Sequence, residues 1–499
     1  LDIGTTALKA AVFDTAGKLL AVSTQEYDLI TPQVNYVEEE GEVYWNAFKH
    51  AVADLKAKHP MGEEDEAALA ISAQGETIFF LDKDGKDLRN AIVWMDNRAQ
   101  EEAEFFKEKF GDETCYKVTG QVSFEPCWPA SKILWVKNHE PEVFAKTAKF
   151  LLIEDYFIYR MTGKFATEGS LVCSSTYWDI IKKEYWPEML ECLGIQEDQL
   201  APVYESGEVV GTIIPEVAEE LGLLKNLTVC TGALDQAAGA IGAGNTHEGM
   251  FSETIGAALA ICAPVARPVF DPNRRMPLHY FANADTYMIH TFTNGGMTLR
   301  WFRDKFCQIE MQAQELGLDD AYNMISKEVS KVPAGSDGLV MLPHLAGSNA
   351  PDVNAKAKGV WFGFTLQHTR AHFMRSVMES LGYIVKRNID SLADMGIEVK
   401  EIRSLGGGSK SDVWNQIKSD ICQIPLETVN SVEAASLGAA ILAGKATGIF
   451  KNLNEAAESM VQVKERTLPN AENKAVYEDG YEMYRKLFGD LDECFKKSI

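Results

Sequence analysis

The sequence lacks the features that mark several classes of protein. Its nine cysteines are scattered without a CxxC pair, so neither a disulfide framework nor a structural zinc site is indicated. No uninterrupted apolar run reaches membrane-spanning length, and no signal peptide is recognisable. Positive charge is scarce, because 48 Lys and Arg stand against 73 Asp and Glu, a net charge of −25. We therefore expect no nucleic acid and no membrane as partner, and a cytoplasmic location.

Several catalytic motifs are also missing. The chain contains no GxxxxGK[ST], no GxGxxG that opens a helix, no GxSxG and no HExxH. A nucleotide would therefore have to bind without a P-loop or a Rossmann fingerprint. The nine histidines are dispersed, and we expect them to be structural or exposed.

The length of the chain predicts at least two domains. With 499 residues, 46% of them hydrophobic, it is too long for one ordinary core. We expect the division at residues 1–245 and 246–499. Both halves open with a strand, a Gly/Thr turn and a second strand, which indicates a weak internal repeat. The chain begins at Leu1 within the first predicted strand, and we expect a few residues of that strand to lie upstream.

The stretch 228–256 joins the two halves. It combines a short β-branched run, a small-residue turn at 231–233, Asp235, and an Ala/Gly-rich helix predicted at 236–241. A carboxylate between a strand and a helix, at the junction of two domains, can face a ligand in a cleft. The alternative is that Asp235 caps the helix by accepting hydrogen bonds from its free N–H groups. The two roles are compatible.

The first turn of the chain, Gly4-Thr5-Thr6, lies in a predicted hairpin that continues through strands at 9–13 and 19–23. Its backbone N–H groups, the two hydroxyls and the ammonium of Lys9 can hold phosphate oxygens, and Asp2 can hold Mg²⁺ through water. The alternative is an ordinary hairpin with a solvated lysine.

Two later strands end in polar clusters. The strand predicted at 67–72 leads to Gln74 and Glu76, and the strand at 91–93 leads to Trp94, Asp96 and Arg98. Carboxylates and amides bind hydroxyl groups, and an aromatic face binds the C–H side of a polyhydroxylated ligand. The alternatives are a half-buried strand aromatic for Trp94 and a local salt bridge between Asp96 and Arg98.

The second half carries a further glycine-rich segment at 406–411, between a strand predicted at 402–405 and a helix at 412–422. Its three glycines let the backbone approach a flat or anionic ligand at a helix start. An ordinary strand-to-helix turn is the alternative. The small-residue helices, such as the one predicted at 433–444, fit either the core or a homodimer interface.

Taken together, the motifs resemble those of the FGGY carbohydrate kinases, over nearly the full length of the chain. In order they are LDIGTTALK, SAQGET, VWMDNRA, TGALDQAAGAIGAG, the turn with Thr254 and Gly256, NGGMTLRW and SLGGGSKSDVWNQIKSD. The family belongs to the actin, hexokinase and Hsp70 superfamily. The resemblance therefore implies an α/β fold of two ribonuclease-H-like domains, each a five-stranded mixed sheet flanked by helices, around a central cleft.

The resemblance also implies a role for each motif, with ATP and Mg²⁺ as cofactors. Asp235 matches the catalytic base, and Asp2 with Asp235 the metal site. Thr5, Thr6 and Lys9 match one phosphate loop, and Thr254 with Gly256 the other. The remaining positions lie near the adenosine (Gly296, Arg300, Gly407, Gly408 and Ser411) or at the acceptor (Gln74, Glu76, Trp94, Asp96, Asp235 and Gln236).

The expected acceptor is a small sugar, sugar acid or polyol. A ketopentose such as D-xylulose comes first, with gluconate or glycerol and other polyols as alternatives. Glycerol kinases carry an Arg where this chain has Gly75, so we expect room for a longer acceptor here. Xylulokinases carry a Met-His pair that this chain lacks, and residues 96–98 are similar to gluconate kinases. An ATP-hydrolysing switch of the actin or Hsp70 type is the alternative from another class.

Overall fold

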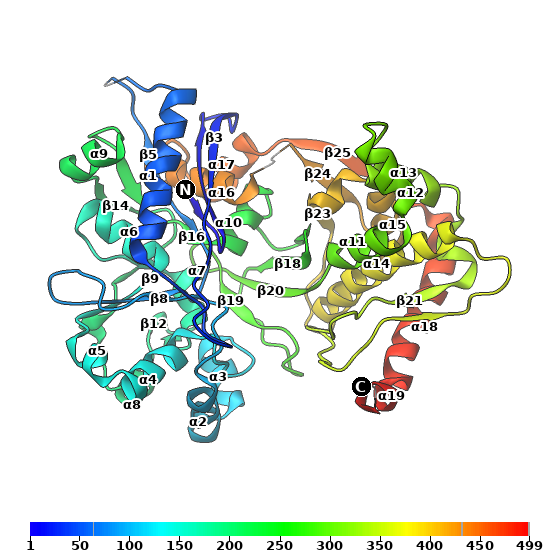
Figure 1. Cartoon of the computed structure of the whole chain (residues 1–499), viewed down its shortest axis with the longest axis horizontal. Helices are drawn as coiled ribbons and strands as arrows, with labels where there is room; N and C mark the ends of the chain where they lie inside the picture. Colours follow the sequence, from blue (N-terminus) through cyan, green and yellow to red (C-terminus); the bar gives the residue numbers. More distant parts are fainter. Residues whose placement is uncertain (63, 431–432, 498–499) are drawn as a thin grey trace.

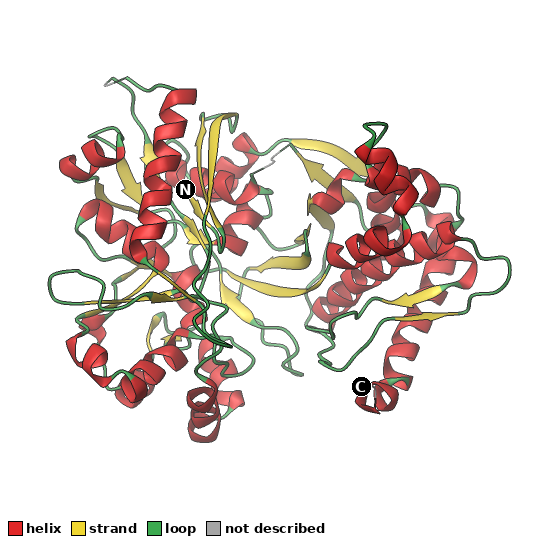
Figure 2. Cartoon of the chain, in the orientation of Figure 1, coloured by secondary structure: helices red, strands yellow, loops and turns green. Residues whose placement is uncertain are grey.

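The computed structural model describes residues 1–62, 64–430 and 433–497, which form two lobes (Figure 1). Each lobe contains a β-sheet with helices packed on it, as the colouring by secondary structure shows (Figure 2). In the view of Figure 1 the N-terminal lobe lies on the left and the C-terminal lobe on the right. This arrangement confirms the predicted α/β fold of two domains.

The N-terminal sheet has the strand order β16-β6-β1-β2-β3. Strands β1 (Asp2–Ile3), β2 (Ala7–Phe13) and β3 (Leu19–Glu26) are antiparallel, as the hairpin pattern predicts. Strands β6 (Ser72–Ala73) and β16 (Ala233–Leu234) run parallel to β1. The first turn, the segment from Gln74 and the start of the following helix at Asp235 therefore meet at the same edge of the sheet.

The strand predicted at 67–72 is divided between two sheets. Its first part, β5 (Ala68–Leu69), pairs with β15 (Thr228–Cys230), whereas β6 belongs to the main sheet. The paired segment 228–234 of the same polypeptide passes from the smaller sheet to the main sheet in the same way, between β15 and β16. At this step a Cβ atom on Gly232 would lie 1.7 Å from the carbonyl oxygen of Ile71. The contact requires a glycine, and no periodicity in the sequence reveals it.

The C-terminal sheet repeats the plan of the N-terminal one. Its central strands are β20, β18, β17, β23 and β24, with β17, β18 and β20 antiparallel and β23 and β24 parallel to β17. Strands β19 and β25 extend it at the edges to seven strands rather than the five expected. The bounds are β17 (Met250–Ile255), β18 (Ala258–Val265), β19 (Leu278–Tyr280), β20 (Tyr287–Asn294), β23 (Glu401–Gly406), β24 (Leu426–Val429) and β25 (Val463–Thr467).

Smaller sheets and helices surround the two main sheets. The smaller sheets contain β4 (Glu38–Glu39), β7 (Ile78–Leu81), β8 (Ala91–Ile92), β9 (Lys149–Leu152), β10 (Thr167–Glu168), β11 (Trp178–Asp179), β12 (Glu184–Tyr185), β13 (Val203–Tyr204), β14 (Val209–Thr212), β21 (Val340–Leu342) and β22 (Val360–Phe362). The helices include α1 (Gly41–Lys58), α2 (Gln100–Phe110), α3 (Asp112–Thr119), α4 (Pro129–His139), α5 (Pro141–Lys146), α6 (Ile153–Thr162), α7 (Gly169–Val172), α8 (Pro187–Leu193), α9 (Pro215–Leu221), α10 (Asp235–Gly242), α11 (Gly296–Phe306), α12 (Gln308–Glu315), α13 (Ala321–Val329), α14 (Arg370–Asp394), α15 (Asp412–Cys422), α16 (Ala434–Ala446), α17 (Leu453–Met460), α18 (Lys474–Asp490) and α19 (Asp492–Lys497).

The hydrophobic core of the N-terminal lobe includes residues from the second half of the chain. Buried side chains of α16 and α17, such as Leu437 and Met460, belong to the same cluster as Ile3 and Leu8. The two main sheets lie on either side of the boundary expected at 245/246, but this core crosses it. That boundary stays a prediction.

Small residues allow α10 and α16 to touch through their backbones. A Cβ atom on Gly242 would lie 1.8 Å from the carbonyl oxygen of Ala434, and one on Gly438 would lie 1.9 Å from that of Ala238. These helices therefore pack against each other inside the molecule, and a homodimer stays a prediction. No helix in the described part of the chain is long and apolar enough to span a bilayer.

This contact predicts opposite effects for the same substitution at two glycines. Gly438→Ala should lower the free energy of unfolding by about 1–3 kcal/mol, because the added methyl group forces the two helices apart. Gly239→Ala, on α10 with no heavy atom within 4 Å of the added Cβ, should instead raise it by roughly 0.5–1 kcal/mol through helix propensity. Urea unfolding measures both, and equal shifts would contradict the backbone contact.

Candidate active site

Asp235 is the first residue of α10, at the sheet edge where the three parallel strands end. Leu234 occupies the position before the helix, so Asp235 is not its N-cap residue. Burial, and then the negative charges of Asp2 and Glu76, raise the pKa of Asp235 to about 7. A carboxyl group with such a pKa can accept a proton near neutral pH.

Asp2 is the first residue of β1, close enough to Asp235 for its charge to raise the pKa of that carboxyl group after burial. Its Oδ1 accepts a hydrogen bond from the Ser72 hydroxyl at 2.8 Å, and burial raises its pKa. Lys9 pairs with Asp2 across the hairpin, and its Nζ lies 2.7 Å from Oε2 of Glu433. The predicted phosphate-binding lysine is therefore also a link to the segment that precedes α16. Its phosphate role stays a prediction.

The first turn is tied to the acceptor cluster through Trp94. The indole Nε1 donates a hydrogen bond to Oγ1 of Thr5 at 2.8 Å, and Thr6 beside it is exposed. Asp96 is 0% exposed and accepts from the Arg98 guanidinium through both carboxylate oxygens. The geometry supports the local salt bridge for Asp96 and offers no free oxygen to an acceptor.

Gln74 and Glu76 lie on the turn that follows β6. The side-chain nitrogen of Gln74 lies 3.4 Å from the hydroxyl of Tyr44, while its Oε1 is buried and has no partner among the described residues. Lys132 on α4 donates from Nζ to the carbonyl oxygens of Glu76 (2.9 Å) and Val93 (3.0 Å). This buried lysine holds the two acceptor segments together, and the sequence analysis missed it. The available signal was a lysine inside an otherwise apolar helix.

A side chain at position 75 would meet close neighbours. A Cβ atom there would lie 2.9 Å from Cδ1 of Leu234 and 3.5 Å from the hydroxyl of Ser174. The expectation that Gly75 leaves room for a longer acceptor stays a prediction.

The second predicted phosphate loop lies at the matching edge of the C-terminal sheet. Thr254 belongs to strand β17 rather than to the turn, which begins at Gly256. A Cβ atom on Gly296 would lie 2.4 Å from the carbonyl oxygen of Gly256, and one on Gly408 would lie 2.8 Å from Cβ of Ile255. Three glycine-containing segments thus converge around Ile255 and expose backbone where a nucleotide could approach.

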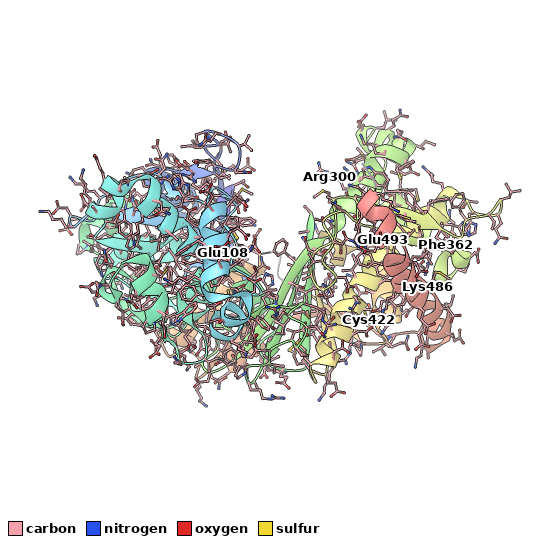
Figure 3. All side chains as sticks on the ribbon, turned by 90° about the horizontal axis from the view of Figure 1, so that it is seen from below. Glu108, Arg300, Phe362, Cys422, Lys486 and Glu493 are labelled. Carbon is pink, nitrogen blue, oxygen red and sulfur yellow. The ribbon has the colours of Figure 1, made fainter. Side chains whose placement is uncertain are left out.

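The other predicted adenosine positions lie close to this point. Gly407 follows β23, and a Cβ atom there would lie 3.8 Å from the carbonyl oxygen of Ile255. Ser411 caps α15 by accepting from the Trp414 N–H at 3.3 Å, and its hydroxyl lies 2.9 Å from that of Ser326. Arg300 on α11 is exposed, 3.7 Å from Asp304, on the lobe opposite Glu108 (Figure 3).

A buried network lies behind Asp235. The N–H of Gly232 donates to Oε1 of Glu154 at 2.7 Å, and the N–H of Leu234 donates to the Ser170 hydroxyl at 3.0 Å. That hydroxyl donates to Glu168 at 2.8 Å, which also accepts from the hydroxyl of Ser206. The network fixes the backbone that leads into α10 and its predicted catalytic residue. Its signal in the sequence is two acids inside the apolar stretch 150–159.

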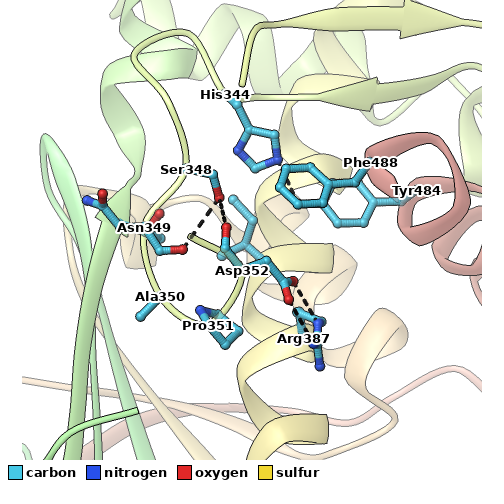
Figure 4. A pocket seen from close by; sticks show the side chains of 11 residues that line it. His344, Ser348, Asn349, Ala350, Pro351, Asp352, Arg387, Tyr484 and Phe488 are labelled. Carbon is cyan, nitrogen blue, oxygen red and sulfur yellow. Dashed lines mark hydrogen bonds and ion pairs between the residues drawn. The ribbon is translucent and has the colours of Figure 1, made fainter. Parts of the chain in front are cut away.

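Two other cavities lie away from these residues. One, of about 10 Å³, holds room for about one water and lies between His344, Ser348, Arg387 and Tyr484 in the C-terminal lobe (Figure 4). A larger groove of about 820 Å³ is lined by Phe13 and neighbouring residues at the end of the N-terminal sheet opposite Asp235. Neither is lined by a predicted site residue.

Comparison with known proteins decides the family. A model of the N-terminal domain of the FGGY family of carbohydrate kinases matches residues 1–242, and one of the C-terminal domain matches residues 237–447. The chain belongs to the FGGY family of carbohydrate kinases. It is 30% identical to a xylulose kinase of Bacillus subtilis, over 99% of this chain and 98% of that protein. It is also 30% identical to a gluconokinase of the same organism, over 98% and 93% of the two chains.

The fold agrees with solved members of the FGGY family. The crystal structure of a ligand-bound xylulose kinase from Lactobacillus acidophilus superposes with a TM-score of 0.89 at 27% identity. The match covers 99% of this chain and 98% of that one. The resemblance found in the sequence is thereby confirmed, as is the activity class of carbohydrate kinase.

The perturbed pKa of Asp235 predicts a pH dependence. If Asp235 is the base, kcat/KM should fall tenfold per pH unit below about 7, because only the ionised carboxylate accepts a proton. Glu76→Gln removes one of the charges that raise this pKa, so its profile should shift to lower pH. Initial rates between pH 5 and 9 test both statements, and a profile that is flat through pH 7 would contradict the assignment.

The network behind Asp235 predicts a loss of turnover without a loss of nucleotide binding. Ser170→Ala removes the acceptor for the Leu234 N–H, and the misplaced helix start should lower kcat by about 10- to 100-fold. The KM for ATP should stay unchanged, because the predicted adenosine positions lie on the other lobe. Ser330→Ala, which removes an exposed hydroxyl at the end of α13, is the matched control. A parallel rise in the KM for ATP would point to general misfolding instead.

Proposed function

We propose that this chain transfers the γ-phosphoryl group of ATP to a hydroxyl of a small sugar, sugar acid or polyol, and that a ketopentose such as D-xylulose is the acceptor. The observation that carries the proposal is the placement of Asp235. It begins a helix beside the first Gly/Thr turn and the Gln74–Glu76 segment, with a pKa of about 7.

The proposed mechanism needs little covalent chemistry from the protein. Phosphoryl transfer requires an in-line hydroxyl and neutralised phosphate charge. Asp235 orients the acceptor hydroxyl and takes its proton, a contribution of roughly 10²–10⁴-fold for a positioned base. Thr5, Thr6 and the backbone at Gly256 hold phosphate oxygens from opposite lobes, which excludes water as a competing acceptor when they approach each other.

The residues present fit a magnesium ion. Asp2 and Asp235 are close enough for the charge of one to raise the pKa of the other, so a cation between them relieves their repulsion. Mg²⁺ binds through one or two carboxylates together with waters and substrate phosphates, and these two carboxylates supply that donor set. When bound, the ion would neutralise phosphate charge.

Electrostatics favours a neutral acceptor over gluconate. Asp2, Glu76 and Asp235 place carboxylates around the acceptor, and the charges of Asp2 and Glu76 both raise the pKa of Asp235. A sugar acid would add another negative charge, which like charges disfavour. The similarity to both a xylulose kinase and a gluconokinase supports these two candidates, and the acidic surroundings support the ketopentose.

The proposed division of labour follows the two predicted domains. Residues 1–245 hold the acceptor, the base and the first phosphate loop, and residues 246–499 hold the adenosine and the second phosphate loop. An ATP-driven switch of the actin or Hsp70 type would need neither the predicted acceptor residues Gln74 and Trp94 nor the buried Lys132 that holds their two segments together. Their joint placement therefore supports the sugar kinase.

Measurement of ADP release with Mg-ATP across an acceptor panel tests this function. The panel comprises D-xylulose, L-xylulose, D-ribulose, gluconate, glycerol, erythritol and xylitol. We expect D-xylulose to raise turnover far above background, and Asp235→Ala to lower it by at least about 10²-fold. Background hydrolysis that no acceptor stimulates, and that Asp235→Ala leaves unchanged, would establish the switch instead.

A further inference from the structure

One face of the C-terminal sheet lies against the start of α10, next to Asp235. The other face packs on helices, because Thr291 on β20 donates to Asn388 on α14 and Glu253 on β17 pairs with Lys418 on α15. Side chains alternate along a strand, so Cys262 and His290, which pair directly across β18 and β20, lie on the opposite face. The thiol of Cys262 lies 3.6 Å from the carbonyl oxygen of Gln236, directly after Asp235.

The same face also reaches the acceptor side of the N-terminal lobe. The rings of His290 and His279 lie 5.6 Å apart, and Nδ1 of His279 lies 3.7 Å from the thiol of Cys173. The next residue, Ser174, adjoins Gly75 and forms a hydrogen bond with the carboxyl group of Glu76, whose pKa is raised by burial. Contacts through Cys262 therefore link His290 to Gln236, next to Asp235, and contacts through His279 and Cys173 link it to the Glu76 segment. In Figure 1, β18 and β20 lie between the two lobes.

The imidazole of His290 has one tautomer fixed by its surroundings. Its Nδ1 lies 2.9 Å from the carbonyl oxygen of Ile261, which only accepts, so Nδ1 carries the hydrogen. Burial lowers the pKa of His290, which keeps the ring neutral. Nε2 then holds a free lone pair. The side chain is half-buried, and no other described residue forms a hydrogen bond with Nε2.

Phe292 follows two residues later on the same face. It is 55% exposed, although the residues on either side of it are buried. It pairs with Ala260, which pairs in turn with Thr254 of the second predicted phosphate loop. Thr254, Ala260 and Phe292 therefore form one row across the sheet, which leads from the second predicted phosphate loop to the exposed Phe292 ring.

We propose that His290 and Phe292 form the wall of the acceptor site on the C-terminal lobe. Nε2 of His290 accepts a hydrogen bond from one hydroxyl of the acceptor, and the Phe292 ring packs on its C–H face. The inference rests on the proposed function, because it requires an acceptor between the two lobes. It adds an uncharged hydrogen-bond acceptor on the C-terminal lobe, opposite the carboxylates of the N-terminal lobe, and so favours a neutral polyhydroxylated ligand.

The test compares two variants of His290 with acceptors that lack single hydroxyls. His290→Leu removes the acceptor atom and should raise the KM for the sugar by about 3- to 10-fold, the usual worth of one hydrogen bond. His290→Gln restores an oxygen and should stay within about twofold of the native value. One monodeoxy acceptor should have a higher KM than the parent sugar with the native protein but an equal KM with His290→Leu. The hydroxyl missing from that acceptor is the one that His290 contacts. The KM for ATP should not change in either variant.

Phe292→Ala gives an independent measurement. It should raise the KM for the sugar and increase ATP hydrolysis without sugar, because the ring no longer excludes water. Ile309→Ala, on the surface of α12 at 72% exposure, is the matched control. The inference is wrong if His290→Leu shows the same rise in KM for every monodeoxy acceptor as the native protein and Phe292→Ala has the native KM for the sugar. Failure of the proposed function differs, because the native protein would then respond to no acceptor.

Discussion

The backbone contact between α10 and α16 is the constraint on which the site depends. α10 begins with Asp235 and leads, through Asn245, into the C-terminal sheet. The side-chain amide of Asn245 donates to the Ser252 hydroxyl at 2.8 Å and to the Cys262 carbonyl at 3.0 Å, so the exit of the helix is fixed to that sheet. α16 packs on the N-terminal sheet and lies directly after Glu433, the partner of Lys9. One pair of small-residue helices thus places the proposed base relative to both predicted phosphate loops.

Buried ionisable groups support both sides of the site, although burial makes charge expensive. Glu154 and Glu168 lie behind Asp235, and burial raises the pKa of both carboxyl groups. The hydroxyl and N–H donors around Glu168 lower its pKa against the effect of burial, whereas the charge of Glu168 raises the pKa of Glu154 further. Lys418 pairs with Glu253 directly before Thr254 and also donates to Ser404 on the neighbouring strand. Apolar residues of similar volume could fill these positions, but they would leave the loop backbones without directional partners.

Local patterns predicted the elements of the fold, whereas long-range contacts decided the details. The first hairpin and the helix at 412–422 follow from turn chemistry and capping, and both lie where expected. The apolar stretch 150–159 fits a strand or a helix by apolarity alone, and its first residues form β9 because they pair with β7. Asp235 is identifiable from its position between two motifs. Lys132 and Glu154 stand out only as charged residues within apolar stretches, and the partners of Lys132, Glu154 and His290 lie far away in the sequence, so their contacts do not follow from local patterns.

The two predicted phosphate loops differ in chemistry although their strands repeat one plan. The first turn reads Gly4-Thr5-Thr6 and presents two hydroxyls, with Asp2 before it and Lys9 after it. The second reads Gly256-Ala257-Ala258 and presents only backbone and methyl groups. The side chains that can reorient as charge shifts during transfer, namely the hydroxyls of Thr5 and Thr6 and the ammonium of Lys9, therefore lie on the N-terminal lobe near Asp235. In the C-terminal turn the Gly256 N–H donates to the Ala258 carbonyl oxygen at 2.9 Å, so its backbone is held in place. A fixed backbone suits the end of the nucleotide that stays in place while the phosphoryl group moves away from it.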